Sequence, residues 1–336
     1  MARAQVLAVS SVLGEHRVST RELLKNAGFE KLGHPTDFIE QELKISHVRR
    51  SNLSVLPSDL AIGAAEKALN EFPGSPHDID ALIFCGIERD CTEPSTAHRI
   101  NKALGTKASL VFDITDACHG FTQGMNVARN FIENGTIKFA LIVTGERSSI
   151  RSEQVSGFFN EGKLGAADIK DKIGAFTLGD AGGAMILGPC HEETGIIDMS
   201  TFTDSRWGDL CKFQNFGAEL GVEPEYGMSM QKICAITIKM VKDYRQQVLD
   251  KVGWDSIDWF VPHQVGELPF LKYLEIFDLP PEKSIATYPE LGNLASATIP
   301  VALARLDSEG KLKTGDKILA ISSGSGVAVT FVSMIY

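Results

Sequence analysis

Patterns typical of metal-binding, membrane-spanning and nucleic-acid-binding proteins are missing from this sequence. The six cysteines form no CxxC pair and have no metal-like spacing with histidine, which predicts that the chain holds no metal. No apolar run approaches the roughly 20 residues that span a bilayer, and the N-terminus carries no cleavable signal. We therefore expect a cytoplasmic protein with free thiols. The net charge of −10 disfavours a nucleic-acid partner, because nucleic-acid binding selects for a basic face.

The composition is that of a chain with a sizeable core. Of the 336 residues, 43% are hydrophobic and 23% are charged, which suits two ordinary domains or one large duplicated one. Hydrophobic periodicity predicts buried strands over residues 4–12 and 78–86, and helices over 20–26, 38–43 and 58–69. Residues 150–172 are polar and are expected to form a loop. The glycines spaced between apolar residues over 174–189 predict a close approach of backbone to a neighbouring element.

One cysteine occupies a position suited to covalent chemistry. A short apolar run ends at Ile114, Cys118 follows after polar residues, and a helical apolar period then extends from Phe121 to Ile132. Cys118 should therefore lie where a strand gives way to the first turn of a helix. Unpaired backbone N–H groups and the helix dipole at that place would lower the pKa of the thiol and favour a thiolate. The alternative is a buried structural cysteine.

The second half of the chain repeats the pattern of the first. SIDWFVPH at 256–263 has the form of DIDALIFC at 78–85, and KILAISSGSG at 317–326 matches KFALIVTGER at 138–147. Asp80 and Asp258 are 178 residues apart, and Gly145 and Gly324 are 179 apart. We interpret this as an internal duplication of an α/β unit, with halves at 1–173 and 174–336. Equivalent strand and helix ends would then meet at one central site.

Three residues converge on that central site in the predicted arrangement. Cys118 comes from the first half, His263 ends the strand expected at 257–261, and Asn293 begins the helix that duplicates the Cys118 helix. Each has a purely structural alternative, since a histidine can be a satisfied core residue and Gly292-Asn293 can be a turn with a helix cap. Their coincidence at matched places of a repeat favours a Cys–His–Asn catalytic site.

These residue types suit acyl transfer. A cysteine at a helix start takes an acyl group from a thioester readily, because one sulfur replaces another. Amide hydrolysis, as in papain-like proteases, is the alternative. His263 and Asn293 can both donate hydrogen bonds toward one point, which suits a developing enolate oxygen. The backbone amides of Cys118 and Gly326 are the expected holders of the oxyanion of the acylated cysteine.

At these residues the sequence resembles the thiolase superfamily, and specifically the β-ketoacyl-ACP synthase III group. The resemblance rests on ACHGF at 117–121, FTLGDAGGAMILG at 176–188, PHQV at 262–265, PELGNLASATIPVAL at 289–303 and SSGSG at 322–326. It implies a five-layered αβαβα thiolase fold, a homodimer and a ping-pong Claisen condensation. It also implies that no metal or redox cofactor is required and that acyl groups arrive on coenzyme A or an acyl carrier protein.

A glutamate in DCTEPSTAHRINKALG, residues 90–105, points to one branch of this group. Glu93 lies 25 residues before Cys118, in a loop where initiating synthases usually carry an apolar residue. In this respect the chain resembles the OleA-type thiolases and the ketosynthases that form α-pyrones. In that branch the glutamate is implied to act across the dimer as a base on the second acyl chain. The alternative is a solvated acid at the start of a helix.

The segment that should contact coenzyme A departs from the initiating synthases. Those enzymes present a tryptophan and an arginine to the nucleotide, whereas residues 36–50 contain Phe38 and no arginine before Arg49. A carrier protein is therefore an alternative donor. Pocket depth is expected to depend on residues 203–228, which show no interpretable pattern.

The expected function is that of a condensing enzyme, an acyltransferase of fatty-acid, polyketide or secondary metabolism. It would join two acyl thioesters into a β-ketoacyl or pyrone-type product. One alternative is a decarboxylative β-ketoacyl-ACP synthase III that initiates chain synthesis. Another is an acyltransferase that passes the acyl group to an alcohol or amine.

Overall fold

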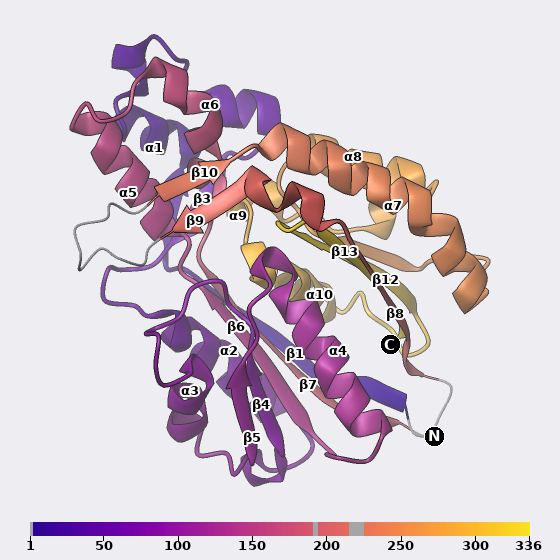
Figure 1. The fold of residues 1–336 in the computed structure, drawn as a ribbon. Helices are drawn as coiled ribbons and strands as arrows, with labels where there is room; N and C mark the ends of the chain where they lie inside the picture. The colour runs from indigo at the N-terminus through magenta and orange to yellow at the C-terminus, as the bar shows by residue number, and fades with distance from the viewer. Residues whose placement is uncertain (1–2, 191–193, 215–224) are drawn as a thin grey trace.

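The fold has five layers, in which three layers of helices alternate with two sheets (Figure 1). The computed structural model describes residues 3–190, 194–214 and 225–336. Two helices cover the outer face of the first sheet, two lie between the sheets and two cover the second sheet. In that order these are α2 (Pro57–Glu71), α3 (Thr96–Leu104), α4 (Gly120–Glu133), α10 (Thr298–Ser308), α7 (Met230–Val252) and α8 (Glu267–Ile276).

The two sheets share one topology. The first has the order β1-β7-β6-β4-β5 and the second the order β8-β13-β12-β11, read from the other edge. In both, two neighbouring strands are parallel (β4 with β6, β11 with β12) and the next two pairs are antiparallel. The strands of the first sheet are β1 (Arg3–Leu13), β4 (Ala81–Phe84), β5 (Leu110–Asp113), β6 (Ala140–Glu146) and β7 (Ala181–Cys190). Those of the second are β8 (Gly195–Thr203), β11 (Trp259–Pro262), β12 (Lys317–Gly324) and β13 (Ala328–Ile335). The internal duplication predicted from the sequence therefore appears in the strand order.

The limit between the halves needs a correction. Residue 173 was the expected end of the first half, but β7 lies beyond it and pairs with both β1 and β6 of the first sheet. A division by sheet membership therefore falls between Cys190 and Gly195. The repeats in sequence did not reveal this, because the first half carries an insertion between β6 and β7, whereas the equivalent strands β12 and β13 of the second half are joined by a short turn.

The duplication extends to an unusual backbone conformation. Ala117 and Ala295 have φ values of 48° and 49°, in the left-handed region that residues other than glycine rarely adopt. Each begins a short 3-10 turn, η4 (Ala117–His119) or η10 (Ala295–Ala297), that leads into an inner helix. These two sharp turns direct the starts of α4 and α10 toward the same place between the sheets.

Most expected elements are present, with one clear exception. Strand β1, helix α1 (Thr20–Asn26), helix α2 and strand β4 match their expected positions, and residues Ile39–Leu43 form a short π-helix. Residues 150–172, however, are largely helical: they contain α5 (Ser149–Asn160) and α6 (Ile169–Lys172). The expected loop is wrong because Arg151 and Ser152 on α5 are buried. A helix that turns polar residues inward has no amphipathic pattern to recognise.

The glycines of β7 allow helices to approach it from both sides. A Cβ atom at Gly182 would lie 2.1 Å from the carbonyl oxygen of Leu60 on α2, and one at Gly183 would lie 2.4 Å from Pro300 Cγ on α10. The close approach predicted for this stretch is confirmed, and it holds the outer and inner helix layers tightly against the first sheet. Among the described residues, no helix has both the length and the apolar character needed to cross a bilayer.

Candidate active site

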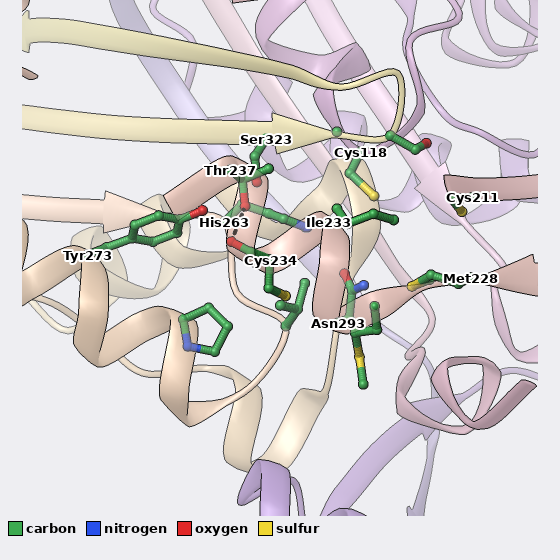
Figure 2. Close-up of a pocket in the computed structure, with 15 residues that line it drawn as sticks. Cys118, Cys211, Met228, Ile233, Cys234, Thr237, His263, Tyr273, Asn293 and Ser323 are labelled. Carbon is green, nitrogen blue, oxygen red and sulfur yellow. Dashed lines mark hydrogen bonds between the residues drawn. The ribbon is translucent and has the colours of Figure 1, made fainter. Parts of the chain in front are cut away.

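A cavity of about 70 Å³ lies where the two halves meet. Its wall includes Cys118 from the start of the first inner helix, His263 from the end of β11 and Asn293 from the turn before α10 (Figure 2). The duplicated fold therefore brings together three residues that are far apart in sequence. This is the arrangement predicted for them.

Cys118 sits in the turn η4, directly after the strained Ala117. Burial raises the pKa of its thiol, and the nearby Glu146 carboxyl and Cys211 thiol raise it further. The lowered pKa expected from the helix start is therefore wrong, since desolvation outweighs the helix amides. The protonated thiol is therefore the form of Cys118 at pH 7.

His263 is buried, and contacts of its backbone N–H and of its ring hold it in place. The backbone N–H donates to the Ile321 carbonyl oxygen at 2.7 Å, and ring atom Nδ1 lies 3.2 Å from Thr298 Oγ1. The Thr298 hydroxyl donates its proton to the Ala295 carbonyl at 3.0 Å, so its oxygen accepts from Nδ1–H. This assignment leaves Nε2 with a lone pair on the cavity side. Burial, with a smaller effect from His119, lowers the pKa of His263 to about 4, so the ring is neutral at pH 7.

Asn293 is fixed in one orientation by its own turn. Its Oδ1 accepts a hydrogen bond from the Ala295 N–H at 2.9 Å, and its backbone N–H donates to the Thr177 carbonyl oxygen at 2.8 Å. Because Oδ1 is engaged within the turn, the Nδ2 amide group remains for the cavity that Asn293 lines. The side chain can therefore act as a hydrogen-bond donor toward a bound group.

Glu93 and Gly326 are placed differently from those three residues. Glu93 is exposed, in the loop between β4 and α3, and among the described residues it is not part of the cavity wall of its own chain. Gly326 lies in the turn between β12 and β13 with a φ of 144°. The described cavity wall includes Gly324 and Ser325 of that turn rather than Gly326. A role of the Gly326 amide toward the oxyanion stays a prediction.

Sequence reasoning missed a buried carboxyl beside the cysteine. Glu146 ends β6, is fully buried, and accepts through Oε1 from the Ile87 N–H at 3.1 Å, the Ser296 N–H at 3.3 Å and the Ser296 hydroxyl. Its Oε2 has no hydrogen-bond partner among the described residues. Burial raises the pKa of Glu146 to about 8. Its position at the carboxyl end of a buried strand was the available signal, because ligand sites form at such ends.

A second cavity of about 720 Å³ adjoins the first. The two share Met230, Cys234, Val265 and Pro269 in their walls. The larger one also contains Phe38 from the N-terminal half, and it reaches Leu268 on α8, whose exposed fraction is 63%. The smaller cavity with its cysteine therefore adjoins a larger one that reaches the surface.

Comparison with known proteins gives a consistent set of relatives. Residues 112–205 match the family model 3-Oxoacyl-[acyl-carrier-protein (ACP)] synthase III, and residues 249–335 match the model of its C-terminal part. The chain is 30% identical to a β-ketoacyl-[acyl-carrier-protein] synthase III of Aliarcobacter butzleri, with 91% of each chain covered. It is 25% identical to an acyl-CoA:acyl-CoA alkyltransferase of Xanthomonas campestris, with 98% of each covered.

Solved structures agree with this set. OleA of Xanthomonas campestris, in a cysteine variant with bound lauric acid and lauroyl-CoA, superposes with a TM-score of 0.92 at 25% identity over 99% of both chains. FabH of Xanthomonas oryzae, a 3-oxoacyl-(acyl carrier protein) synthase III, superposes with a TM-score of 0.91 at 25% identity over the whole of both. The five-layered thiolase fold expected from the sequence is confirmed by these matches.

Proposed function

The chain belongs to the β-ketoacyl-ACP synthase III family of the thiolase superfamily, and we propose on that basis that it joins two acyl thioesters by Claisen condensation. The observation that carries the proposal is that Cys118, His263 and Asn293 line one cavity between the duplicated halves. The enzyme is then an acyltransferase that works through an acyl-cysteine intermediate. Within the family, the exposed Glu93 favours this condensation over the decarboxylative one, because its carboxylate can act as the base.

The first half-reaction loads Cys118. The thiol proton passes to His263 Nε2, which the Thr298 contact leaves unprotonated, and the sulfur attacks the thioester carbonyl. The backbone amides of Cys118 and Gly326 hold the oxyanion of the tetrahedral intermediate. The carbon–sulfur bond to the carrier then breaks, and the carrier thiol leaves with the proton from His263. Acyl-Cys118 and a neutral histidine remain.

The second half-reaction forms the carbon–carbon bond. Glu93 of a partner subunit removes a proton from the carbon next to the carbonyl of the second acyl thioester. Neutral His263 and the Asn293 amide donate hydrogen bonds to the enolate oxygen as it forms. For this the Thr298 hydroxyl reverses, so that it donates to Nδ1 while Nε2 carries the hydrogen. The enolate carbon attacks acyl-Cys118, the Cys118 thiolate is expelled and takes up the proton that Glu93 removed, and a β-ketoacyl thioester leaves. Where the acyl group on Cys118 already carries a β-keto group, the product is a 3,5-diketo thioester, whose enol oxygen at the fifth carbon can attack the thioester carbonyl, release the carrier thiol and close a pyrone ring.

A homodimer is part of this proposal because Glu93 does not line the cavity of its own chain. The loop that carries Glu93 is braced: Asp90 accepts from the Ser58 N–H at 3.0 Å and pairs with Arg99 at 3.3 Å. We propose that a second copy of the chain covers this braced loop, so that Glu93 reaches the cavity of the partner.

Coenzyme A and an acyl carrier protein are both proposed as acyl carriers, since the names of the relatives include both. The wider cavity, of about 720 Å³, is the proposed place for the arm that such carriers share, and its lining includes Lys170 and Lys272 together with Glu42 and Asp171. The reaction as written uses only side chains and backbone amides of the protein and its two thioester substrates, and no step calls for a metal or redox cofactor.

A decarboxylative synthase III is the second candidate, and the names of the synthase III relatives favour it. Mass spectrometry of products separates the two after incubation with acyl-CoA alone, malonyl thioester alone, or both. Under our proposal acyl-CoA alone gives a β-ketoacyl product that retains all carbons of both chains. A product formed only when the malonyl thioester is present, with loss of carbon dioxide, would overturn it.

Substitution of Glu93 tests the base and its subunit. Glu93→Gln keeps the size of the side chain but removes its basicity, so Cys118 should still be acylated while condensation is abolished. A mixed dimer of one Glu93→Gln chain and one Cys118→Ala chain should recover about half of the wild-type activity if Glu93 acts across the interface. If it acts within its own chain, no complete site exists and the mixed dimer stays inactive. Full activity of the Glu93→Gln homodimer would favour the decarboxylative function.

A further inference from the structure

The wall of the cysteine cavity continues along a two-stranded ribbon. Strands β9 (Cys211–Gln214) and β10 (Glu225–Met228) pair with Cys211 opposite Met228 and Phe213 opposite Tyr226. Opposed residues of an antiparallel pair share a face, and so do residues two apart on one strand. Cys211 and Met228 line the cavity (Figure 2). Phe213 and Tyr226 therefore lie on the same face of the ribbon as Cys211 and Met228, two residues further along each strand.

Tyr226 carries a hydroxyl that the described residues leave without a hydrogen bond. Only 7% of its surface is exposed, and its OH has no partner in the part of the chain that the structure describes. Burial raises the pKa of Tyr226, and the Cys211 and Cys118 thiols raise it further, so the phenol is neutral at pH 7. A buried donor of this kind costs stability unless something accepts from it.

Space beside this hydroxyl is kept open by a glycine. A Cβ atom at Gly174 would lie 3.1 Å from the Tyr226 hydroxyl and 3.4 Å from the Met228 sulfur. A side chain there would fill the place between the phenol and a residue of the cavity wall. Gly174 therefore lies against both the Tyr226 hydroxyl and the sulfur of Met228, which lines the cavity.

The ribbon ends at a buried ion pair. Arg151 on α5 places its guanidinium over the Phe213 ring and pairs with Glu88, and the two side chains are only 5% and 14% exposed. The wall thus changes along its length, from the sulfur atoms of Cys211 and Met228 to a phenol and a charged pair. An unsubstituted alkyl chain in that place would desolvate polar groups and satisfy none of them.

We propose that this wall selects an acyl chain bearing an oxygen atom, a keto or hydroxyl group, which accepts a hydrogen bond from Tyr226. The inference rests on the proposed acylation of Cys118 and adds to it the substrate class. It makes Tyr226 a specificity-determining residue. An acyl group with an oxygen at the matching carbon satisfies the phenol, whereas the parent alkyl group leaves it unpaired.

The test is the rate of Cys118 acylation, followed by intact-protein mass. The substrates are octanoyl-CoA and a series of octanoyl-CoA derivatives with a keto or hydroxyl oxygen at successive chain carbons. We expect at least one oxygenated member to acylate the wild-type protein roughly tenfold or more faster than octanoyl-CoA, in kcat/KM, the usual effect of a buried hydrogen bond. Tyr226→Phe should remove most of that preference while octanoyl-CoA still reacts. Gly174→Ala should reduce it too, because its methyl group occupies the space beside the hydroxyl.

Tyr244→Phe is the matched control. Tyr244 stacks on Phe202 from α7 and takes no part in the described cavity wall, so its loss of a hydroxyl should leave the preference unchanged. If octanoyl-CoA reacts as fast as every oxygenated member, or if Tyr226→Phe keeps the preference, the inference is overturned. If no thioester acylates Cys118, the proposed function itself has failed, and the two results are distinguishable.

Discussion

Replacing Glu146 by glutamine should stabilise the protein in alkaline solution and have little effect in acid. The folded chain holds this carboxyl protonated up to a pKa of about 8, whereas the ordinary value is 4.5. The group therefore favours the folded state fully below pH 4.5, and this contribution is lost as pH rises toward and past 8. At about 1.4 kcal/mol for each pH unit, the interval corresponds to about 5 kcal/mol as an upper limit. Glu146→Gln keeps an oxygen for the Ile87 and Ser296 donors and has no proton to lose.

Urea unfolding at pH 4.5, 7 and 9 measures this effect. The free energy of unfolding of Glu146→Gln should equal that of the wild type at pH 4.5 and exceed it by several kcal/mol at pH 9. Glu133→Gln is the control, because Glu133 forms an i,i+4 pair with Arg129 at the edge of solvent, and such pairs are worth only about 0.5 kcal/mol. The Glu146 charge also raises the pKa of Cys118, so alkylation of that thiol by iodoacetamide at pH 9 should be faster in the glutamine variant. A constant difference across pH, or a variant that is less stable at pH 9, would refute the reasoning.

Three further outcomes are expected at the cavity. Cys118→Ala should gain no acyl mass from an acyl thioester, and persistent acylation of that variant on another cysteine would sink the nucleophile assignment. Ala at Asn293 should still permit acylation but slow condensation by roughly a hundredfold or more, the usual cost of an oxyanion donor, whereas Ala at His263 should slow both half-reactions because His263 also accepts the thiol proton; near wild-type condensation in both would remove the enolate role. The acid limb of the wild-type rate should lie near pH 4 rather than near 6, because His263 must be neutral to act and its pKa is lowered to about 4; a limb at pH 6 would show that the ring is hydrated in the working enzyme.

The arrangement of the fold could largely be predicted from the sequence, because the same α/β pattern occurs twice along the chain. The offset of 178 residues between Asp80 and Asp258 also separates Ala117 from Ala295, whose matching φ values the sequence could not show. The repeat places Cys118, His263 and Asn293 at strand ends or helix starts, which predicted that they would lie close together. In the structure all three line one cavity.

What the sequence did not reveal depends on burial. The lowered pKa expected for Cys118 was wrong, because local position suggests a helix dipole while only the packed structure shows the desolvation that outweighs it. Helix α5 was missed for a related reason, since Arg151 finds a buried partner in Glu88, far away in sequence. Part of the stretch 203–228 whose pattern was uninterpretable proves to be the ribbon that carries Tyr226, and residues 215–224 lie outside the described chain.

The paired turns at Ala117 and Ala295 have a consequence for how such a chain can change. The residue after each alanine lies at the equivalent place, where the two halves meet. It is Cys118 in the first half and Ser296 in the second. Ser296 holds the Glu146 carboxyl by its hydroxyl and backbone N–H, whereas Cys118 opens to the cavity. The same backbone position therefore has a different role in each half: Cys118 lines the cavity, whereas Ser296 fixes the Glu146 carboxyl. A duplicated scaffold can therefore acquire an asymmetric active site by single substitutions, with no change to the backbone that either copy requires.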